Sequence, residues 1–173
     1  MNSEILPKNW LELFAQSYQK VKDNIFSKPY PSAVRLITAS KSGLPSVRMV
    51  LLKSYDERGF VIYTNMNSRK GRELQENRLV ALYFYWPEIH QEILVEGEVK
   101  IINDAESDNY FQSRFFFSKI GAHSSKQSSD MKCRAEFFAR ILFYTIKYAL
   151  RKKVNRPVFW GGFRVVPKKI EFM

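Results

Sequence analysis

The first apolar pattern along the chain has the period of an α-helix. Apolar residues recur at steps of three and four from Trp10 to Val21, and the pattern fades near Lys22-Asp23-Asn24. Because residues three and four apart share one face of a helix, this segment is predicted to be an amphipathic helix that serves packing. Three further helices are predicted, at residues 68–77 after the capping residue Ser68, at 105–115, and at 131–152, where basic residues suit the helix dipole.

Short apolar segments separated by turn residues predict strands. In chain order these are residues 33–39, 47–53, 60–64, 79–85, 93–102, 159–166 and 169–172. The turn signal Asp56-Glu57-Arg58-Gly59 makes the second and third strands an antiparallel hairpin. Short strands joined by hairpins, with helices inserted between them, indicate a mainly β fold, an antiparallel barrel decorated by helices.

Composition limits the size and the partners of the protein. A chain of 173 residues, 45% hydrophobic and 15% aromatic, predicts one globular domain over residues 1–173. The excess of 28 basic over 17 acidic residues gives +11, which favours anionic partners: phosphorylated small molecules, nucleic acid or acidic membrane surfaces. Charge alone does not choose among them.

The N-terminal residues and the single cysteine favour a cytoplasmic protein. The first eight residues lack a basic start, an apolar core and a small-residue cleavage site, so no secretory signal is evident. Cys133 has no second cysteine with which to form an internal disulfide, and it is expected to be a buried or inert thiol rather than a nucleophile.

The apolar segment Phe137–Ile146 does not have the features of a membrane span. It is shorter than the roughly 20 residues that a bilayer requires. Arg140 lies within it and Lys147 follows it. A packed or dimer-facing helix is expected there in preference to a helix lying on a membrane surface.

Anion-seeking groups gather at the edges of three apolar segments, at residues 48–53, 63–64 and 68–70. The helix predicted to begin at Ser68 offers free backbone N–H groups and the positive end of its dipole, which together favour a bound phosphate. Arg48 and Lys53 are five residues apart, so on a flat strand they point to opposite faces. Either they reach different groups, or a bulge near Leu52 re-aims one of them.

The segment RMVLLKSYDERGFVIYTNMNSRK resembles the flavin-binding core of the pyridoxamine (pyridoxine) 5′-phosphate oxidases. Four later segments resemble that family in the same order and at its usual spacing: Tyr110-Phe111-Gln112-Ser113-Arg114, Ser118-Lys119-Ile120-Gly121-Ala122, Ser125-Lys126-Gln127-Ser128-Ser129 and Phe159-Trp160-Gly161-Gly162-Phe163-Arg164-Val165. The resemblance extends from about Leu11 to the last residue. It implies a split β-barrel, FMN as the cofactor, and a homodimer with two flavins at the interface.

The resemblance also implies roles for particular residues. Residues implied to surround FMN are Arg48, Met49, Val50, Leu51, Leu52, Lys53, Tyr63, Thr64, Arg69, Lys70, Gln127 and Ser128. Those implied to bind the phosphate of the substrate are Lys53, Tyr110, Arg114 and Ser118. The last three are each four apart, so a continuous helix would place them in one stripe, although an ordinary exposed helix face has the same spacing. No catalytic residue and no metal site is predicted, and His90 and His123 are expected at the surface or in packing.

Two positions depart from the family pattern. Glu92 stands where the family usually has a glutamine that contacts the flavin ring, and Gln91 could replace that contact only through a register shift. A carboxylate beside a reduced, anionic flavin would tune the cofactor or weaken its binding. Met173 stands where the family commonly has tryptophan, and the usual C-terminal segment with its Arg-x-His pair is expected to be absent.

Three functions are compatible with these observations. The first is an FMN-dependent oxidase that converts pyridoxamine or pyridoxine 5′-phosphate to pyridoxal 5′-phosphate, with oxygen as the second substrate. The second is an FMN-binding relative that has lost this oxidase activity or acts on another substrate. The third, a basic nucleic-acid-binding module, is disfavoured because no base-stacking motif is recognised. Neither nucleic acid nor a membrane is therefore expected as a partner.

Overall fold

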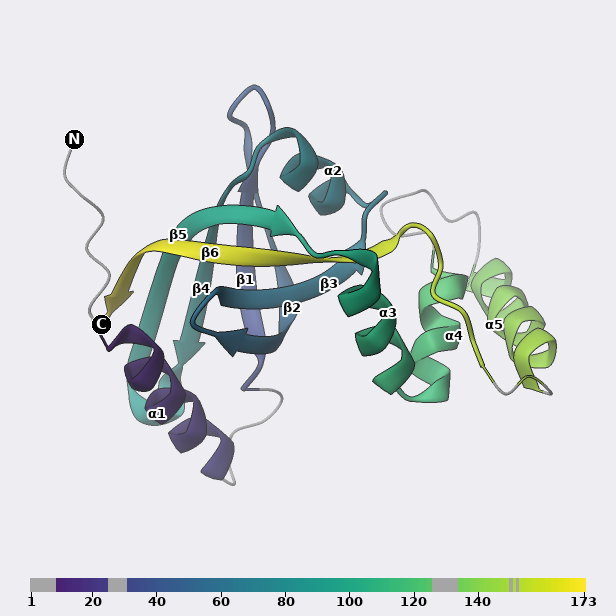
Figure 1. Ribbon diagram of the computed structural model, residues 1–173, viewed down its shortest axis with the longest axis horizontal. Helices are drawn as coiled ribbons and strands as arrows, with labels where there is room; N and C mark the ends of the chain where they lie inside the picture. Colours follow the sequence, from purple (N-terminus) through teal and green to yellow (C-terminus); the bar gives the residue numbers. More distant parts are fainter. Residues whose placement is uncertain (1–8, 25–30, 126–133, 150, 152) are drawn as a thin grey trace. The chain divides into compact units, whose positions relative to one another are not determined.

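The computed structural model describes residues 9–24, 31–125, 134–149, 151 and 153–173 (Figure 1). The predicted FMN contacts Gln127 and Ser128 lie outside the described residues, as does Cys133. The chain divides into two compact units. The first comprises Met1–Ile62, Glu73–Lys100 and Phe163–Met173, and the second comprises Tyr63–Arg72 and Ile101–Gly162. The single domain over residues 1–173 remains a prediction.

Six strands of the described chain close into a barrel in the order β1-β2-β3-β6-β5-β4. Their bounds are β1 Ala33–Ala39, β2 Pro45–Asp56, β3 Gly59–Asn65, β4 Leu79–Trp86, β5 Gln91–Ile101 and β6 Trp160–Phe172. β1 pairs antiparallel with β2 and β4, β2 with β3, and β4 with β5. This confirms the predicted antiparallel barrel decorated by helices (Figure 1).

The β2–β3 hairpin closes at the turn predicted from sequence. Asp56 pairs with Gly59 across the turn, and Gly59 has φ 120°, a conformation that favours glycine. The Asp56 carboxylate is held by Arg58 at 2.6 Å and by Arg164 of β6 at 2.8 Å. Burial raises the pKa of Asp56, but the hydrogen bonds from Arg58 and the charge of Arg164 outweigh burial, so the pKa is lowered. These contacts fasten the turn to β6.

The last strand is continuous, so the predicted break between residues 166 and 169 is wrong. β6 passes through Pro167 because the neighbouring strands leave room for it. A Cβ added to Gly97 of β5 would lie 2.2 Å from the Val166 carbonyl oxygen, and one added to Gly59 would lie 3.1 Å from Pro167 Cδ. Pro167 is therefore beside Gly59, the first residue of β3.

The core of the first unit is aromatic. Helix α1 (Trp10–Asp23) confirms the first predicted helix and carries Phe14, which is fully buried. The Phe14 ring lies 4.9 Å from the Phe60 ring and 5.1 Å from the Phe84 ring, centroid to centroid and edge to face. Such pairs stabilise beyond their buried area, so α1 is held to the barrel by packing, as expected.

The second unit is mainly helical. It contains α3 (Asp104–Ser113), α4 (Phe116–Ser124), α5 (Arg134–Ala149) and the first residues of α2 (Arg69–Glu76). The Asn103 side chain caps α3 by accepting from the Glu106 N–H at 2.8 Å. Buried residues from these helices, from the segment after α5 and from the start of β6 form the core of this unit: Phe111, Ile120, Tyr148, Val154 and Trp160.

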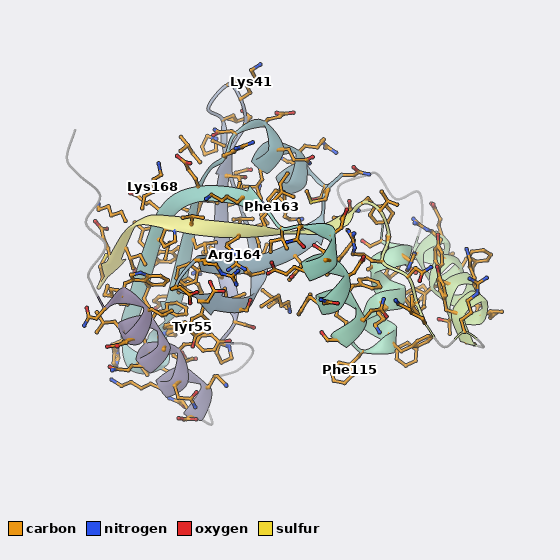
Figure 2. All side chains as sticks on the ribbon, in the orientation of Figure 1. Lys41, Tyr55, Phe115, Phe163, Arg164 and Lys168 are labelled. Atoms are coloured by element: carbon orange, nitrogen blue, oxygen red, sulfur yellow. The ribbon has the colours of Figure 1, made fainter. Side chains whose placement is uncertain are left out.

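Several large apolar side chains of the second unit remain exposed. Phe115, between α3 and α4, points away from the ribbon (Figure 2). On α5 the exposed apolar residues are Phe138, Leu142, Phe143 and Ile146. None of the helices in the described part of the chain is long and apolar enough to cross a membrane.

His123 of α4 is a partly buried histidine that contacts a backbone carbonyl and two tyrosines. Its Nε2 lies 2.8 Å from the Asn155 carbonyl oxygen, and its ring packs 5.1 Å from those of Tyr144 and Tyr148. Burial lowers the pKa of His123 below 6.5, more than the Asn155 carbonyl raises it, and Lys147 lowers it further. The unfolded chain therefore binds the proton more readily than the folded one.

We expect the free energy of unfolding to fall as pH drops through 6.5, because protonation favours the unfolded chain. Urea denaturation at pH 7.5 and 5.5, values chosen about one unit either side of the ordinary histidine pKa, measures this loss. His123→Asn should remove this contribution to the pH dependence. His90→Asn, at the exposed end of the short helix η1 (Pro87–Ile89), is the control and should retain it. An equal pH response in His123→Asn and the parent protein would contradict the assignment.

Candidate cofactor and substrate site

The two faces of β2 differ as strand parity predicts. Val47, Met49, Leu51 and Lys53 alternate along an exposed face, whereas Arg48 lies on the opposite, more buried face. The register between β2 and β3 shifts between Leu52 and Ser54. The irregularity lies where a bulge was one of the two alternatives, but Lys53 stays in phase with the exposed residues Met49 and Leu51. Lys53 and Arg48 therefore lie on opposite faces of β2.

Arg48 is engaged in a polar network within the first unit. Its Nη2 lies 2.9 Å from Glu73 Oε2, and its Nη1 donates to Thr38 Oγ1 at 2.6 Å. The same Glu73 oxygen accepts from Thr38 Oγ1 at 2.5 Å and from Ser46 Oγ at 2.6 Å. Glu73 is 6% exposed. The Arg48 guanidinium is thus bound to protein groups. If Arg48 contacts FMN as predicted, the contact would be made by its backbone.

The start of α2 has the features of an anion site. Ser68 Oγ accepts from the Gly71 N–H at 3.2 Å, which caps the helix as predicted, and Lys70 Nζ donates to the same oxygen at 3.2 Å. The first turn contains no acidic residue and carries Arg69 and Lys70. A Cβ on Gly71 would lie 2.4 Å from the Met66 carbonyl oxygen, so only glycine allows this close approach. The positive end of the helix dipole and two cations fit the phosphate of FMN.

Three aromatic rings lie nearly parallel in the second unit. The Tyr63 ring is 4.2 Å from that of Tyr110 and 5.0 Å from that of Trp160, with interplanar angles of 10° and 4°. Tyr63 is a predicted FMN contact, and Tyr110 is a predicted substrate contact. The structure therefore brings one residue of each set together. Thr64, the other predicted FMN contact on this stretch of β3, is buried.

Arg114 is a partly buried cation with an unmet donor. Its Nη1 is buried and has no hydrogen-bond partner among the described residues. Burial lowers the pKa of Arg114, and the nearby Tyr110 partly opposes this effect. An unpaired donor on a buried cation is costly, and an anionic ligand would satisfy it.

The predicted stripe of Tyr110, Arg114 and Ser118 on one helix is wrong. α3 ends at Ser113, and Arg114 has ψ 150°, which is extended backbone. Ser118 lies on the separate helix α4 and is exposed. Tyr110 and Arg114 remain coupled electrostatically. The Arg114 guanidinium lies over the rings of Phe111 and Trp160 instead.

Trp160 was not among the predicted site residues, although it lies in a motif that resembles the family. The guanidinium carbon of Arg114 is 4.9 Å from the centroid of the Trp160 ring. Nothing local marks this tryptophan, because its contacts come from α3 and β3, far away in sequence. The only available signal was the adjacent Gly161-Gly162, which indicates close backbone approach.

Glu92 occupies its predicted position without a register shift. It pairs with Tyr85, and Gln91 pairs with Trp86, so the shift that would let Gln91 replace the family glutamine does not occur. The Tyr83 hydroxyl donates to the Glu92 carboxylate, and this hydrogen bond is the main reason that the pKa of Tyr83 is raised. A pocket of ≈ 560 Å³ within the first unit is lined by Tyr85, Pro87, His90, Gln91, Glu92 and Met173.

The predicted site residues fall into both units. Residues 48–53 belong to the first, and Tyr63, Thr64, Arg69, Lys70, Tyr110, Arg114 and Ser118 belong to the second. Among the residues that the structure describes, no group of three or more His, Cys, Asp or Glu side chains could hold a metal ion.

Gly162 leaves the space in which the Tyr63 ring lies. A Cβ at Gly162 would be 2.6 Å from Tyr63 Cε1 and 2.9 Å from Ile102 Cδ1. We expect Gly162→Ala to lower the free energy of unfolding by about 1–3 kcal/mol through overpacking. Gly121→Ala on α4 is the matched control, since nothing lies within 4 Å of an added Cβ, and should gain about 0.5–1 kcal/mol. Urea denaturation of both variants checks this, and equal effects would contradict it.

Comparison with known proteins agrees with this geometry. The family model described as pyridoxamine 5′-phosphate oxidase matches residues 25–141. A pyridoxine/pyridoxamine 5′-phosphate oxidase of Myxococcus xanthus is 44% identical over 168 residues, covering 97% of this chain and 80% of the relative. One from Wolbachia pipientis is 44% identical over 167 residues, covering 96% and 76%.

Solved structures give the same fold. PhzG from Burkholderia lata, in complex with tetrahydrophenazine-1-carboxylic acid, has a TM-score of 0.82 and 25% identity, covering 99% of this chain and 86% of that one. A pyridoxamine 5′-phosphate oxidase-related, FMN-binding protein of Nostoc punctiforme has a TM-score of 0.74 at 12% identity, covering 97% and 84%. With its closed barrel and its extended match to the family model, the chain belongs to the pyridoxamine 5′-phosphate oxidase family of FMN-binding split-barrel proteins.

Proposed function

We propose that the protein is an FMN-dependent oxidase that converts pyridoxamine or pyridoxine 5′-phosphate to pyridoxal 5′-phosphate. FMN is the cofactor that family membership supports, and the chain is an oxidoreductase of this family. The observation that carries the choice of a phosphorylated substrate is the buried, unpaired Nη1 of Arg114 beside Tyr110. A substrate phosphate would give this donor its acceptor.

The residues of this chain would bind and orient, and the cofactor would carry the redox step. When bound, FMN supplies the acceptor for the hydride removed from the substrate, and oxygen takes up the electrons to give hydrogen peroxide. Ser68, Arg69 and Lys70 would hold the phosphate of FMN at the start of α2. Arg114, Tyr110 and Ser118 of the second unit would hold the phosphate of the substrate, which fixes the position of its reacting carbon. Lys53 of the first unit stays a predicted substrate contact.

The proposal includes a cytoplasmic homodimer. The exposed face of β2 supports a subunit interface, since Met49 is 56% exposed and is flanked by the exposed apolar residues Val47 and Leu51. Contiguous exposed apolar side chains mark interaction surfaces. Light scattering coupled to size-exclusion chromatography measures the mass in solution, and a monomer at all concentrations would reject the dimer.

The test of the oxidase is direct. Protein purified with FMN is expected to be yellow and to release FMN when denatured. Given pyridoxamine or pyridoxine 5′-phosphate in air, it should form the aldehyde and hydrogen peroxide together. If flavin-loaded protein forms neither product with either substrate, the proposed oxidase activity is wrong.

A second candidate is an FMN-dependent oxidoreductase that acts on another substrate. It is favoured by the likeness to PhzG, which covers 99% of the chain and was solved with a tricyclic carboxylic acid rather than a phosphorylated pyridine. The Glu92 carboxylate at a family flavin-contact position also favours altered chemistry. Inorganic phosphate should inhibit turnover competitively if the substrate carries a phosphate, and should leave it unchanged if the substrate is an unphosphorylated acid.

A further inference from the structure

We propose that Trp160 is a positioning residue that holds the Arg114 guanidinium ready for the phosphate of the substrate, and that Arg156 fixes Trp160 to α3. The identity of the ligand rests on the proposed function. The positioning itself rests on contacts within the second unit.

The Arg114 guanidinium packs over the Trp160 ring. The guanidinium carbon lies 4.9 Å from the Trp160 ring centroid and 5.6 Å from that of Phe111. A guanidinium over an aromatic ring is held by cation–π attraction, which leaves its N–H groups available to a planar or tetrahedral anion. Nη1 has no hydrogen-bond partner among the described residues. Within the described part of the chain, the contacts that orient Arg114 are therefore with aromatic rings.

The Trp160 ring is itself held on several sides. Phe111 meets it edge to face at 5.1 Å, and Tyr63 lies parallel to it at 5.0 Å. Tyr110 lies parallel to Tyr63 at 4.2 Å. Trp160 thereby links the predicted flavin contact Tyr63 to both phosphate-binding candidates, Tyr110 and Arg114. A shift of this ring would move the cation and disturb the stack.

Arg156 joins the backbone of Trp160 to the helix that precedes Arg114. Its Nη1 donates to the Trp160 carbonyl oxygen at 2.5 Å. Its Nε and Nη2 donate to Asp108 and Asp104 of α3, both at 2.5 Å. All three nitrogens of the Arg156 guanidinium donate in these contacts, and the Arg156 side chain is only 11% exposed. The distance between Trp160 and α3, and so the approach of Arg114, is fixed by this residue.

A purely structural role for Trp160 makes a different prediction. Trp160 is 7% exposed and belongs to the core of its unit, so its loss must cost stability in either case. If packing were its only role, ligand affinity would follow stability alone. If Trp160 positions Arg114, affinity for a phosphorylated ligand falls only while Arg114 is present. The two roles therefore separate in a double-mutant cycle.

The experiment measures the dissociation constant of flavin-loaded protein for pyridoxal 5′-phosphate, with inorganic phosphate as a competitor. Trp160→Leu should raise this constant on the order of 10-fold through loss of the cation–π contact, and Trp160→Phe should restore most of the affinity. In an Arg114→Gln background, Trp160→Leu should have no further effect. The control Trp10→Leu removes an equally buried ring, 9% exposed, from the first unit and should leave the constant unchanged.

Each other outcome overturns the proposal. The proposal is wrong if the parent protein and Trp160→Leu have equal dissociation constants. It is also wrong if Trp160→Leu still weakens binding in the Arg114→Gln background, or if the parent protein binds neither anion in a way that depends on Arg114. If Trp160→Leu does not fold, Arg156→Gln keeps the Trp160 ring and should still raise the dissociation constant. An unchanged dissociation constant in Arg156→Gln rejects the proposal.

Absence of aldehyde and peroxide rejects the oxidase activity only. The double-mutant cycle of dissociation constants still decides whether Trp160 positions Arg114.

Discussion

Replacing Glu73 with leucine is expected to lower the free energy of unfolding by about 3–5 kcal/mol, because it leaves a partly buried cation without its counter-ion. Arg48, Thr38 and Ser46 all direct donors at one oxygen of Glu73, within 2.9 Å. Removing that acceptor leaves three polar groups to be satisfied at once. Urea denaturation, with the unfolding slope checked for two-state behaviour, measures the loss.

The control for Glu73→Leu lies on the same helix. Glu76 is exposed near the end of α2, so Glu76→Leu should change the free energy of unfolding by no more than about 0.5 kcal/mol. Glu73→Gln keeps an acceptor and should fall between the two variants. A loss of less than about 1 kcal/mol in Glu73→Leu would show that the network contributes no more than an exposed pair.

The double variant Arg48→Met/Glu73→Leu tests what Arg48 is for. Replacing a buried ion pair by apolar residues is often neutral for stability, so the double variant should recover most of what Glu73→Leu loses. If Arg48 serves the network alone, this variant still binds FMN with the affinity of the parent protein. If the guanidinium also contacts FMN, stability returns while FMN affinity does not.

The strands could be predicted from sequence because their signals are local. Alternating apolar residues and turn residues gave β1 its observed bounds, Ala33–Ala39, and placed the β2–β3 hairpin. Strand parity placed Arg48 and Lys53 on opposite faces of β2, and the alternation of burial along the strand agrees with that placement. The helix cap at Ser68 was also local, since Ser68 Oγ accepts from the Gly71 N–H three residues later. Such features depend on a few residues that are neighbours in the sequence, so they can be predicted from the sequence alone.

The remaining features depend on contacts between distant segments. No residue close to Arg48 in the sequence indicates that its guanidinium will pair with the carboxylate of Glu73, 25 residues away. α3 ends at Ser113 rather than Phe115, although no glycine or proline marks the end. β6 continues through Pro167 because Gly59 and Gly97 lie beside it, and their positions follow from barrel closure. Family resemblance therefore supplied a set of site residues that remains a prediction, and the partners of those residues could not be read from the sequence.

Replacing Arg114 with glutamine is expected to raise KM for pyridoxamine 5′-phosphate by about 10- to 100-fold, the cost of one charge-assisted hydrogen bond. The guanidinium carries a buried Nη1 with no partner among the described residues, so a substrate phosphate would be its main acceptor. Glutamine keeps a donor but loses the charge. Steady-state kinetics at saturating FMN and in air measure KM and kcat separately.

The comparison that decides the role of Arg114 uses a substrate without phosphate. Arg114→Gln should leave kcat/KM for unphosphorylated pyridoxamine unchanged, because the lost contact never formed with it. Arg78→Gln, a matched loss of an exposed arginine in the first unit, should change neither substrate's constants. An equal loss with both substrates would place Arg114 in general packing instead. Because the phosphate is remote from the reacting carbon, its binding energy serves to orient that carbon, so a fall in kcat accompanying the rise in KM would indicate that the orientation is lost as well.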